Sequence, residues 1–273
     1  MPPTLRTWVR GHLAVLLVLA AALGSVVGGA VGAAAFSRFA GGPPEPTGRP
    51  VALAEGLPRI VDRISPAVVE VRTSSLGGHG IGSGIILTSN GLVLTNFHVI
   101  SGASPAGRIT VQTGTAATGG PVQPATLIGA DPKADLAVIR ITNASGLVPA
   151  PLGNSDRLAV GDPVIAMGAP SGLQGTASFG IVSALDRLVQ VAGPSLGLAG
   201  QGPPVTYRAI QTDAALSPGN SGGPLVDQSE TVIGITSAVF EGTKGSSIGV
   251  GFAIPINDAE KLVRAMVVQY GPK

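Results

Sequence analysis

The segment Gly219-Asn220-Ser221-Gly222-Gly223-Pro224 determines how the rest of the sequence is interpreted. A serine hydroxyl is a weak nucleophile unless a neighbouring base removes its proton. Glycines on both sides of Ser221 allow a sharp turn whose backbone N–H groups can point at a developing oxyanion. Two other interpretations are open at this point: a glycine-rich turn between strands, and the G-x-S-x-G nucleophile elbow of α/β-hydrolases.

The positions of the histidines separate these alternatives. The chain has three, His12, His79 and His98, and all of them precede Ser221. An α/β-hydrolase needs its histidine later in the chain than the serine, and it needs a helix directly after the serine. This sequence has neither. His12 lies beside a long apolar segment, and His79 lies in a glycine-rich loop. His98, at the end of an apolar strand, is the candidate general base, although a lone histidine there is more often a core residue.

A carboxylate must hold the imidazole of such a base in its correct tautomer. Asp135 stands at the start of the apolar strand predicted at 136–141. A lone aspartate in that position is usually a turn residue. Asp213 is the rival, but it lies close to Ser221 in the sequence and on the second group of strands. We therefore favour Asp135 as the partner of His98.

Short apolar segments separated by turn residues predict an all-β fold, without the long helical stretches of a βαβ fold. Two groups of six strands predict two antiparallel β-barrels, over 59–150 and 151–273. Asn90-Gly91 predicts a tight hairpin in which both residues tolerate a positive φ. One soluble helix is expected, at the C-terminus, with Asn257 and Glu260 as its capping pair. The strands are expected at 67–72, 85–88, 92–95, 109–112, 125–128, 136–141, 164–167, 176–182, 209–212, 224–226, 231–239 and 250–254.

The N-terminal region differs from the rest in composition. Residues 13–36 are mostly Leu, Val, Ala and Gly, which is enough to cross a bilayer as a helix. Two arginines within residues 1–12 predict that this end stays in the cytoplasm and that the body is exported. A cleaved signal peptide is the alternative, because Ala33-Ala34-Ala35 resembles a cleavage site. Residues 37–58 are rich in Gly and Pro and are expected to form a linker.

Charge and cysteine content exclude several function classes. Lys and Arg number 17 against 15 Asp and Glu, a formal net charge of +2 without any basic cluster, so we expect no nucleic-acid partner. The absence of cysteine excludes disulfides, a thiol nucleophile and Cys-based metal sites. A serine mechanism requires no metal or cofactor, and we expect none.

Four segments together resemble the HtrA/Deg family of trypsin-like serine proteases. They are Thr95-Asn96-Phe97-His98-Val99, Asp135-Leu136-Ala137-Val138, Gly219 to Leu225, and Gly251-Phe252-Ala253-Ile254-Pro255. The similarity extends over roughly 60–270, and the order His, Asp, Ser is that of chymotrypsin. Gly82-Ser83-Gly84 is a supporting match.

This resemblance implies a chymotrypsin-like fold and a serine endopeptidase of unfolded or exported proteins. His98 would be the general base, Asp135 its orienting acid and Ser221 the nucleophile, with an oxyanion hole at Gly219, Asn220 and Ser221. It also implies a homotrimer and a site in the bacterial cell envelope, with the enzyme held at the membrane by its N-terminal helix. Family members usually carry PDZ domains, and this sequence contains none, so regulation without one is expected.

Substrate preference is read from the expected primary pocket. In trypsin-like enzymes the base of this pocket lies six residues before the nucleophile, which here is Ala215. With Ser237 and Val250 as the other pocket residues, no carboxylate attracts Lys or Arg, and cleavage after small to medium aliphatic residues is expected. Two rival functions are a non-catalytic, chaperone-like protein that binds unfolded chains, and an esterase that uses the same site.

Overall fold

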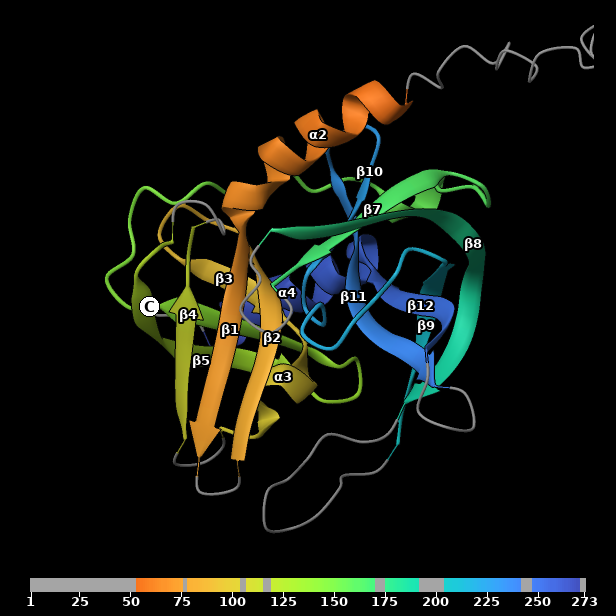
Figure 1. Ribbon diagram of the computed structural model, residues 1–273. Helices are drawn as coiled ribbons and strands as arrows, with labels where there is room; N and C mark the ends of the chain where they lie inside the picture. Colours follow the sequence, from red (N-terminus) through yellow and green to blue (C-terminus); the bar gives the residue numbers. More distant parts are fainter. Residues whose placement is uncertain are drawn as a thin grey trace, which may run out of the picture. The chain divides into compact units, whose positions relative to one another are not determined.

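The computed structural model of the chain describes residues 53–75, 78–103, 107–114, 119–169, 175–191, 204–241 and 247–270. Within them lie two antiparallel sheets, shown in Figure 1 together with the helices that cover them. The all-β architecture with a C-terminal helix that the sequence predicts is confirmed.

The first sheet carries two of the three candidate catalytic residues. Its strands pair in the order β1-β2-β3-β6-β5-β4, and pairing of β1 with β4 closes it into a barrel. Alternate residues such as Val71, Val93 and Ile139 point inward and are fully buried. The strands are β1 (Val68–Ser75), β2 (Gly78–Ile86), β3 (Leu92–Thr95), β4 (Arg108–Gln112), β5 (Val122–Asp131) and β6 (Leu136–Ile141).

The second sheet closes in the same way, because β10 pairs with β7. Its order is β10-β11-β12-β9-β8-β7, around a separate core that includes Ile210, Leu225 and Ile233. The segment with Ser221 connects β9 to β10. The strands are β7 (Pro163–Gly168), β8 (Thr176–Val191), β9 (Val205–Thr212), β10 (Pro224–Asp227), β11 (Val232–Glu241) and β12 (Ser247–Pro255).

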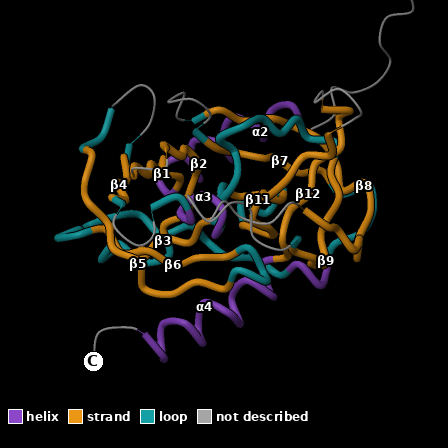
Figure 2. The backbone as a smooth tube through the Cα atoms, turned by 90° about the horizontal axis from the view of Figure 1, so that it is seen from below, coloured by secondary structure: helices purple, strands orange, loops and turns teal. Residues whose placement is uncertain are grey.

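The C-terminal helix α4 (Ile256–Tyr270) follows the second sheet but packs against the first. Ala259 and Met266 belong to one buried cluster with Leu94 of β3 and Val138 of β6. Figure 2 shows α4 running along β5 and β6. The helix therefore ties the two sheets together.

The expectation of a single soluble helix and of a linker reaching residue 58 is wrong. Helix α2 (Leu53–Ile64) and a 3₁₀ turn, η1 (Ser65–Ala67), lead into β1. The apolar face of α2, with Ile60 and Ile64 buried, packs against Val68 of the first sheet and Val226 of the second. Burial of this face stabilises a helix that Pro58 would otherwise disfavour. Figure 1 shows α2 lying across both sheets.

Two further expectations about local structure are corrected. In the hairpin between β2 and β3 only Gly91 has a positive φ, of 90°, and its N–H donates to the carbonyl of Thr88 at 3.1 Å. Asn257 lies inside the first turn of α4, where its side-chain Oδ1 accepts the N–H of Ser155 at 3.2 Å. Asn257 thus fastens the 3₁₀ turn η2 (Ser155–Arg157) to α4 and does not form a capping pair.

The predicted membrane segment at 13–36 and the linker residues 37–52 lie outside the described residues. In the part of the chain that the structure covers, no helix is both long enough and apolar enough to cross a bilayer.

Candidate active site

The imidazole of His98 and the carboxylate of Asp135 form a hydrogen-bonded pair. His98 lies in the short helix α3 (Phe97–Ser101), which follows the end of β3. Its Nδ1 is 2.8 Å from Oδ2 of Asp135, and its backbone N–H donates to Oδ1 at 2.9 Å. Because an ionised carboxylate can only accept, Nδ1 carries the proton and the lone pair of Nε2 is free to act as a base.

The backbone holds Asp135 in an unusual conformation. Its φ is 53°, a left-handed value that costs energy for a residue with a side chain. The backbone N–H of Phe97 and the side-chain amide of Asn96 both donate to the carbonyl of Asp135, at 3.0 and 2.8 Å. Asp135 is 4% exposed, whereas the side chain of His98 is 37% exposed. The carboxylate is therefore shielded from water, whereas the imidazole is partly exposed.

The rival residues lie elsewhere. Oδ1 of Asp213 accepts the backbone N–H of Ile181 at 2.7 Å, so this carboxylate holds β8 near the serine segment. His79 lies in β2, opposite Ser74 of β1, and not in a loop as expected. His12 is outside the described residues.

The serine segment forms two successive tight turns. The N–H of Asn220 donates to the carbonyl of Ser217 at 3.0 Å, and that of Gly223 donates to the carbonyl of Asn220 at 2.9 Å. Gly219 and Gly222 have φ values of 102° and 88°, which residues with a Cβ rarely adopt. The sequence therefore needs glycine at both positions for the chain to turn on each side of Ser221.

Ser83 of β2 fastens this segment to the first sheet. Its N–H donates to the carbonyl of Ser221 at 2.7 Å, and its hydroxyl donates to the carbonyl of Gly219 at 2.7 Å. The same hydroxyl accepts the N–H of Ala169 at 2.9 Å, while the carbonyl of Ser83 accepts the hydroxyl of Thr95 at 2.6 Å. In the sequence, Ser83 stands out only because it lies between Gly82 and Gly84.

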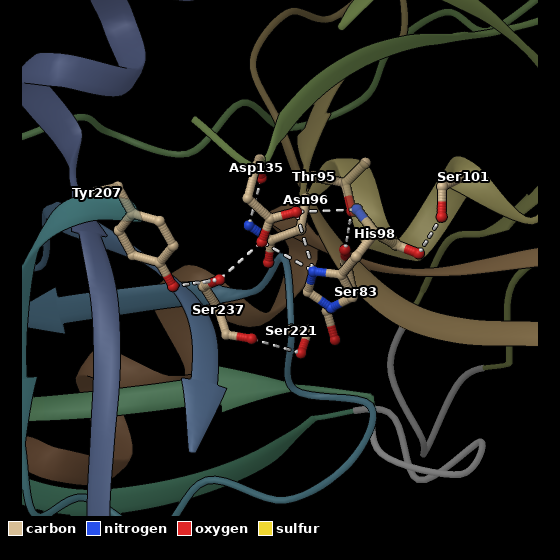
Figure 3. A network of polar contacts seen from close by, with 9 residues as sticks. All are labelled: Ser83, Thr95, Asn96, His98, Ser101, Asp135, Tyr207, Ser221 and Ser237. Carbon is tan, nitrogen blue, oxygen red and sulfur yellow. Dashed lines mark hydrogen bonds and ion pairs between the residues drawn. The ribbon is translucent and has the colours of Figure 1, made fainter. Parts of the chain in front are cut away.

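Ser237 of β11 is bonded to both Asp135 and Ser221, and Figure 3 shows this network. Its hydroxyl donates to Oδ2 of Asp135 at 2.8 Å, and its carbonyl accepts the hydroxyl of Ser221 at 3.0 Å. Tyr207 of β9 donates its hydroxyl to Oγ of Ser237 at 2.8 Å. The hydroxyl of Ser237 is thus bonded to Asp135, and its place in a substrate pocket stays a prediction. Tyr207 was missed because nothing in its sequence context marks it.

The N–H groups around Ser221 divide into engaged and unengaged ones. Those of Gly219 and Ser221 donate to no acceptor in the described part of the chain, so both are available to a carbonyl oxygen. The N–H of Asn220 is occupied by Ser217, which removes Asn220 from the predicted oxyanion hole. Likewise, no hydrogen bond joins Ser221 to His98 among the described residues. The hydroxyl of Ser221 rests on the carbonyl of Ser237 and would have to turn to reach His98.

The contacts in the described part of the chain give the other two residues of the predicted pocket no role. Ala215 is exposed, and its carbonyl accepts the hydroxyl of Ser178 at 2.6 Å. Val250 of β12 is partly buried and packs against the cluster that contains Tyr207. The pocket itself stays a prediction.

Comparison with known proteins agrees with this geometry. Residues 82–235 match the model of the family described as "Trypsin-like peptidase domain". Serine protease PepD of Mycobacterium tuberculosis is 40% identical over 94% of this chain and 58% of its own length. The periplasmic pH-dependent serine endoprotease DegQ of Escherichia coli is 41% identical over 69% of this chain and 37% of its own length. The chain thus spans well under two thirds of these relatives.

Solved structures give the same result. The HtrA-type protease AlgW with tripeptide is 38% identical, with a TM-score of 0.64, over 77% of this chain and 63% of its own. Deg5 is 32% identical, with a TM-score of 0.65, over 80% of this chain and 97% of its own. The order of His98, Asp135 and Ser221 on two closed sheets, together with these similarities, leads to one conclusion: the chain belongs to the trypsin-like peptidase family, as a member of its HtrA type.

Proposed function

We propose that the chain is a serine endopeptidase in which Ser221 attacks peptide bonds, His98 is the general base and Asp135 orients His98. The observation that carries this proposal is the buried carboxylate of Asp135, which is bonded to Nδ1 of His98. Ser237 links this carboxylate to Ser221, because its hydroxyl donates to Asp135 and its carbonyl accepts the hydroxyl of Ser221. The family membership supports the same chemistry.

The reaction follows from these contacts. The hydroxyl of Ser221 turns from the carbonyl of Ser237 toward Nε2 of His98, gives up its proton and attacks the peptide carbonyl. Asp135 stabilises the imidazolium that forms. The unengaged N–H groups of Gly219 and Ser221 donate to the oxyanion, a contribution of roughly 3 kcal/mol for each donor. His98 then protonates the leaving amine, and water releases the acyl group.

Substrate, location and assembly are part of the proposal. Without a carboxylate at Ala215, the preferred residue before the cut is small to medium and aliphatic. The substrates are unfolded or exported polypeptides, and the protease domain lies outside the cytoplasm, held by the segment at 13–36. The name of the periplasmic relative DegQ supports this location. A homotrimer is the proposed assembly.

A fluorophosphonate probe tests the function directly. The full chain should be labelled at Ser221 and should hydrolyse an unfolded protein, whereas Ser221→Ala should do neither and keep its thermal stability. A peptide library should be cut after aliphatic residues; cleavage mainly after Lys or Arg would refute the pocket. An ester substrate tested alongside separates a peptidase from an esterase. A wild-type chain that binds unfolded protein but is neither labelled nor active is the chaperone-like alternative.

A further inference from the structure

Tyr207 belongs to the hydrogen-bond network of the candidate active site although it lies behind it. It is 8% exposed on β9, and its hydroxyl donates to Oγ of Ser237 at 2.8 Å. Oγ of Ser237 donates in turn to Oδ2 of Asp135 at 2.8 Å. A serine hydroxyl has one proton, so a donor from Tyr207 leaves that proton directed at Asp135. Figure 3 shows the relay Tyr207–Ser237–Asp135.

The carboxylate at the end of this relay is the one that holds His98. Asp135 receives three donors: the backbone N–H of His98, Nδ1–H of His98 and the hydroxyl of Ser237. Each donor that withdraws charge from the carboxylate weakens its pull on the imidazole proton. Hydrogen bonds in a chain also strengthen one another, so a donor to Ser237 tightens the bond from Ser237 to Asp135.

We propose that Tyr207 is a positioning residue. Its hydroxyl keeps the hydroxyl proton of Ser237 directed at Asp135 and thereby sets how strongly Asp135 holds His98. This inference rests on the proposed function. Tyr207 touches neither the nucleophile nor the substrate, so its effect passes entirely through Ser237.

The protonation states allow the relay to operate over the whole working range of a protease. Burial raises the pKa of Tyr207 well above its ordinary value, so its hydroxyl stays a donor. Asp135, from the turn before β6, and His98, from α3, are the titratable side chains bonded to the network in the described residues. A change in the pH dependence of activity in a Tyr207 variant therefore reports on Asp135 and His98.

The alternative is that Tyr207 only fills space, since its ring packs in one cluster with Phe252 and Val189. Tyr207→Phe keeps the ring and removes only the hydroxyl. Ser237→Ala removes the acceptor through which Tyr207 acts, and Ser237→Thr keeps a hydroxyl at that position. These variants, with the double variant Tyr207→Phe/Ser237→Ala, separate a relay from packing.

The experiment measures kcat, KM and the pH profile of kcat/KM on the full chain, with sites counted by fluorophosphonate titration so that unfolded protein does not contribute. We expect Tyr207→Phe to lower kcat about fivefold, the effect of one hydrogen bond, because Ser237 then holds Asp135 less firmly in position, with KM unchanged. The acid limb should move to higher pH by about 0.3 units, because Asp135 then holds the imidazole proton more strongly. Ser237→Thr should retain most of the activity.

The double variant Tyr207→Phe/Ser237→Ala decides between a relay and packing. In the Ser237→Ala background, Tyr207→Phe should cause no further loss of kcat, and it should raise thermal stability by removing a buried hydroxyl without an acceptor. An equal loss in both backgrounds, or a wild-type kcat and pH profile for Tyr207→Phe, would overturn the inference. A wild-type protein that the probe does not label would instead refute the proposed function.

Discussion

Replacing Ser83 by alanine tests whether one hydroxyl of the first sheet holds the serine segment of the second. Ser83 is fully buried, and its hydroxyl donates to the carbonyl of Gly219 at 2.7 Å and accepts the N–H of Ala169 at 2.9 Å. Ser83→Ala leaves both groups buried without this partner. Each unsatisfied group costs about 1–3 kcal/mol, so for the two groups we expect a loss of about 2–6 kcal/mol in the free energy of unfolding.

This loss is large enough to measure in two ways. In a domain of this size about 1 kcal/mol corresponds to roughly 2–4 °C, so the Tm of Ser83→Ala should fall by roughly 4–24 °C in circular dichroism. The rate of fluorophosphonate labelling should fall as well, because the carbonyl of Gly219 loses the bond that orients the turn before Ser221.

Ser229→Ala is the matched control. Ser229 is exposed in the turn after β10, and its removal should change the stability by less than about 0.5 kcal/mol. If Ser83→Ala were as stable and as quickly labelled as Ser229→Ala, the two hydrogen bonds of Ser83 would not be what fastens the serine segment, and the reasoning would be refuted.

Three further experiments give independent tests. Asp135→Asn should lower kcat on the order of 10⁴-fold without unfolding, because an amide donor forces the proton of His98 onto Nε2; near-normal turnover would contradict the assignment. Gly222→Ala should abolish labelling, since its Cβ would lie 2.2 Å from a carbonyl oxygen. Gly161 also has a positive φ but has open space around it, so Gly161→Ala should cost only about 1–2 kcal/mol of stability. Above about pH 10 the side chain of Tyr207 ionises in the unfolded chain but stays protonated in the folded chain, because burial raises its pKa. Wild-type stability, measured by urea unfolding, should therefore fall relative to Tyr207→Phe by up to about 1.4 kcal/mol per pH unit. Parallel stability curves for the two proteins would exclude this.

The strands were predictable because short apolar runs bounded by turn residues mark them directly. The segments expected at 92–95 and 136–141 have the same bounds in the structure, as β3 and β6. β8 extends from Thr176 to Val191, well beyond its predicted end at 182, because ladder hydrogen bonds continue through polar residues. Helix α2 was missed because Pro58 and the glycine-rich residues before it mask an apolar face that only the two sheets reveal.

The candidate site was predictable only in part. Chain order and local motifs were enough to choose His98, Asp135 and Ser221, since each stands in a context suited to one chemical task. The links between them depend on which strands become neighbours in space. Ser237 and Tyr207 come from β11 and β9, and no local pattern tells that their hydroxyls meet behind Asp135. The same holds for Ser83, whose partners come from the other sheet.

The position of α4 has a consequence for the order in which the molecule matures. A polypeptide leaves the ribosome from its N-terminus, so the sheet with His98 and Asp135 emerges first. Yet Leu94 and Val138 on that sheet are covered by α4, which follows the second sheet in the chain. Until α4 has been made, this surface has no cover. The first sheet can therefore complete its burial only after the second sheet, including the segment with Ser221, has been synthesised.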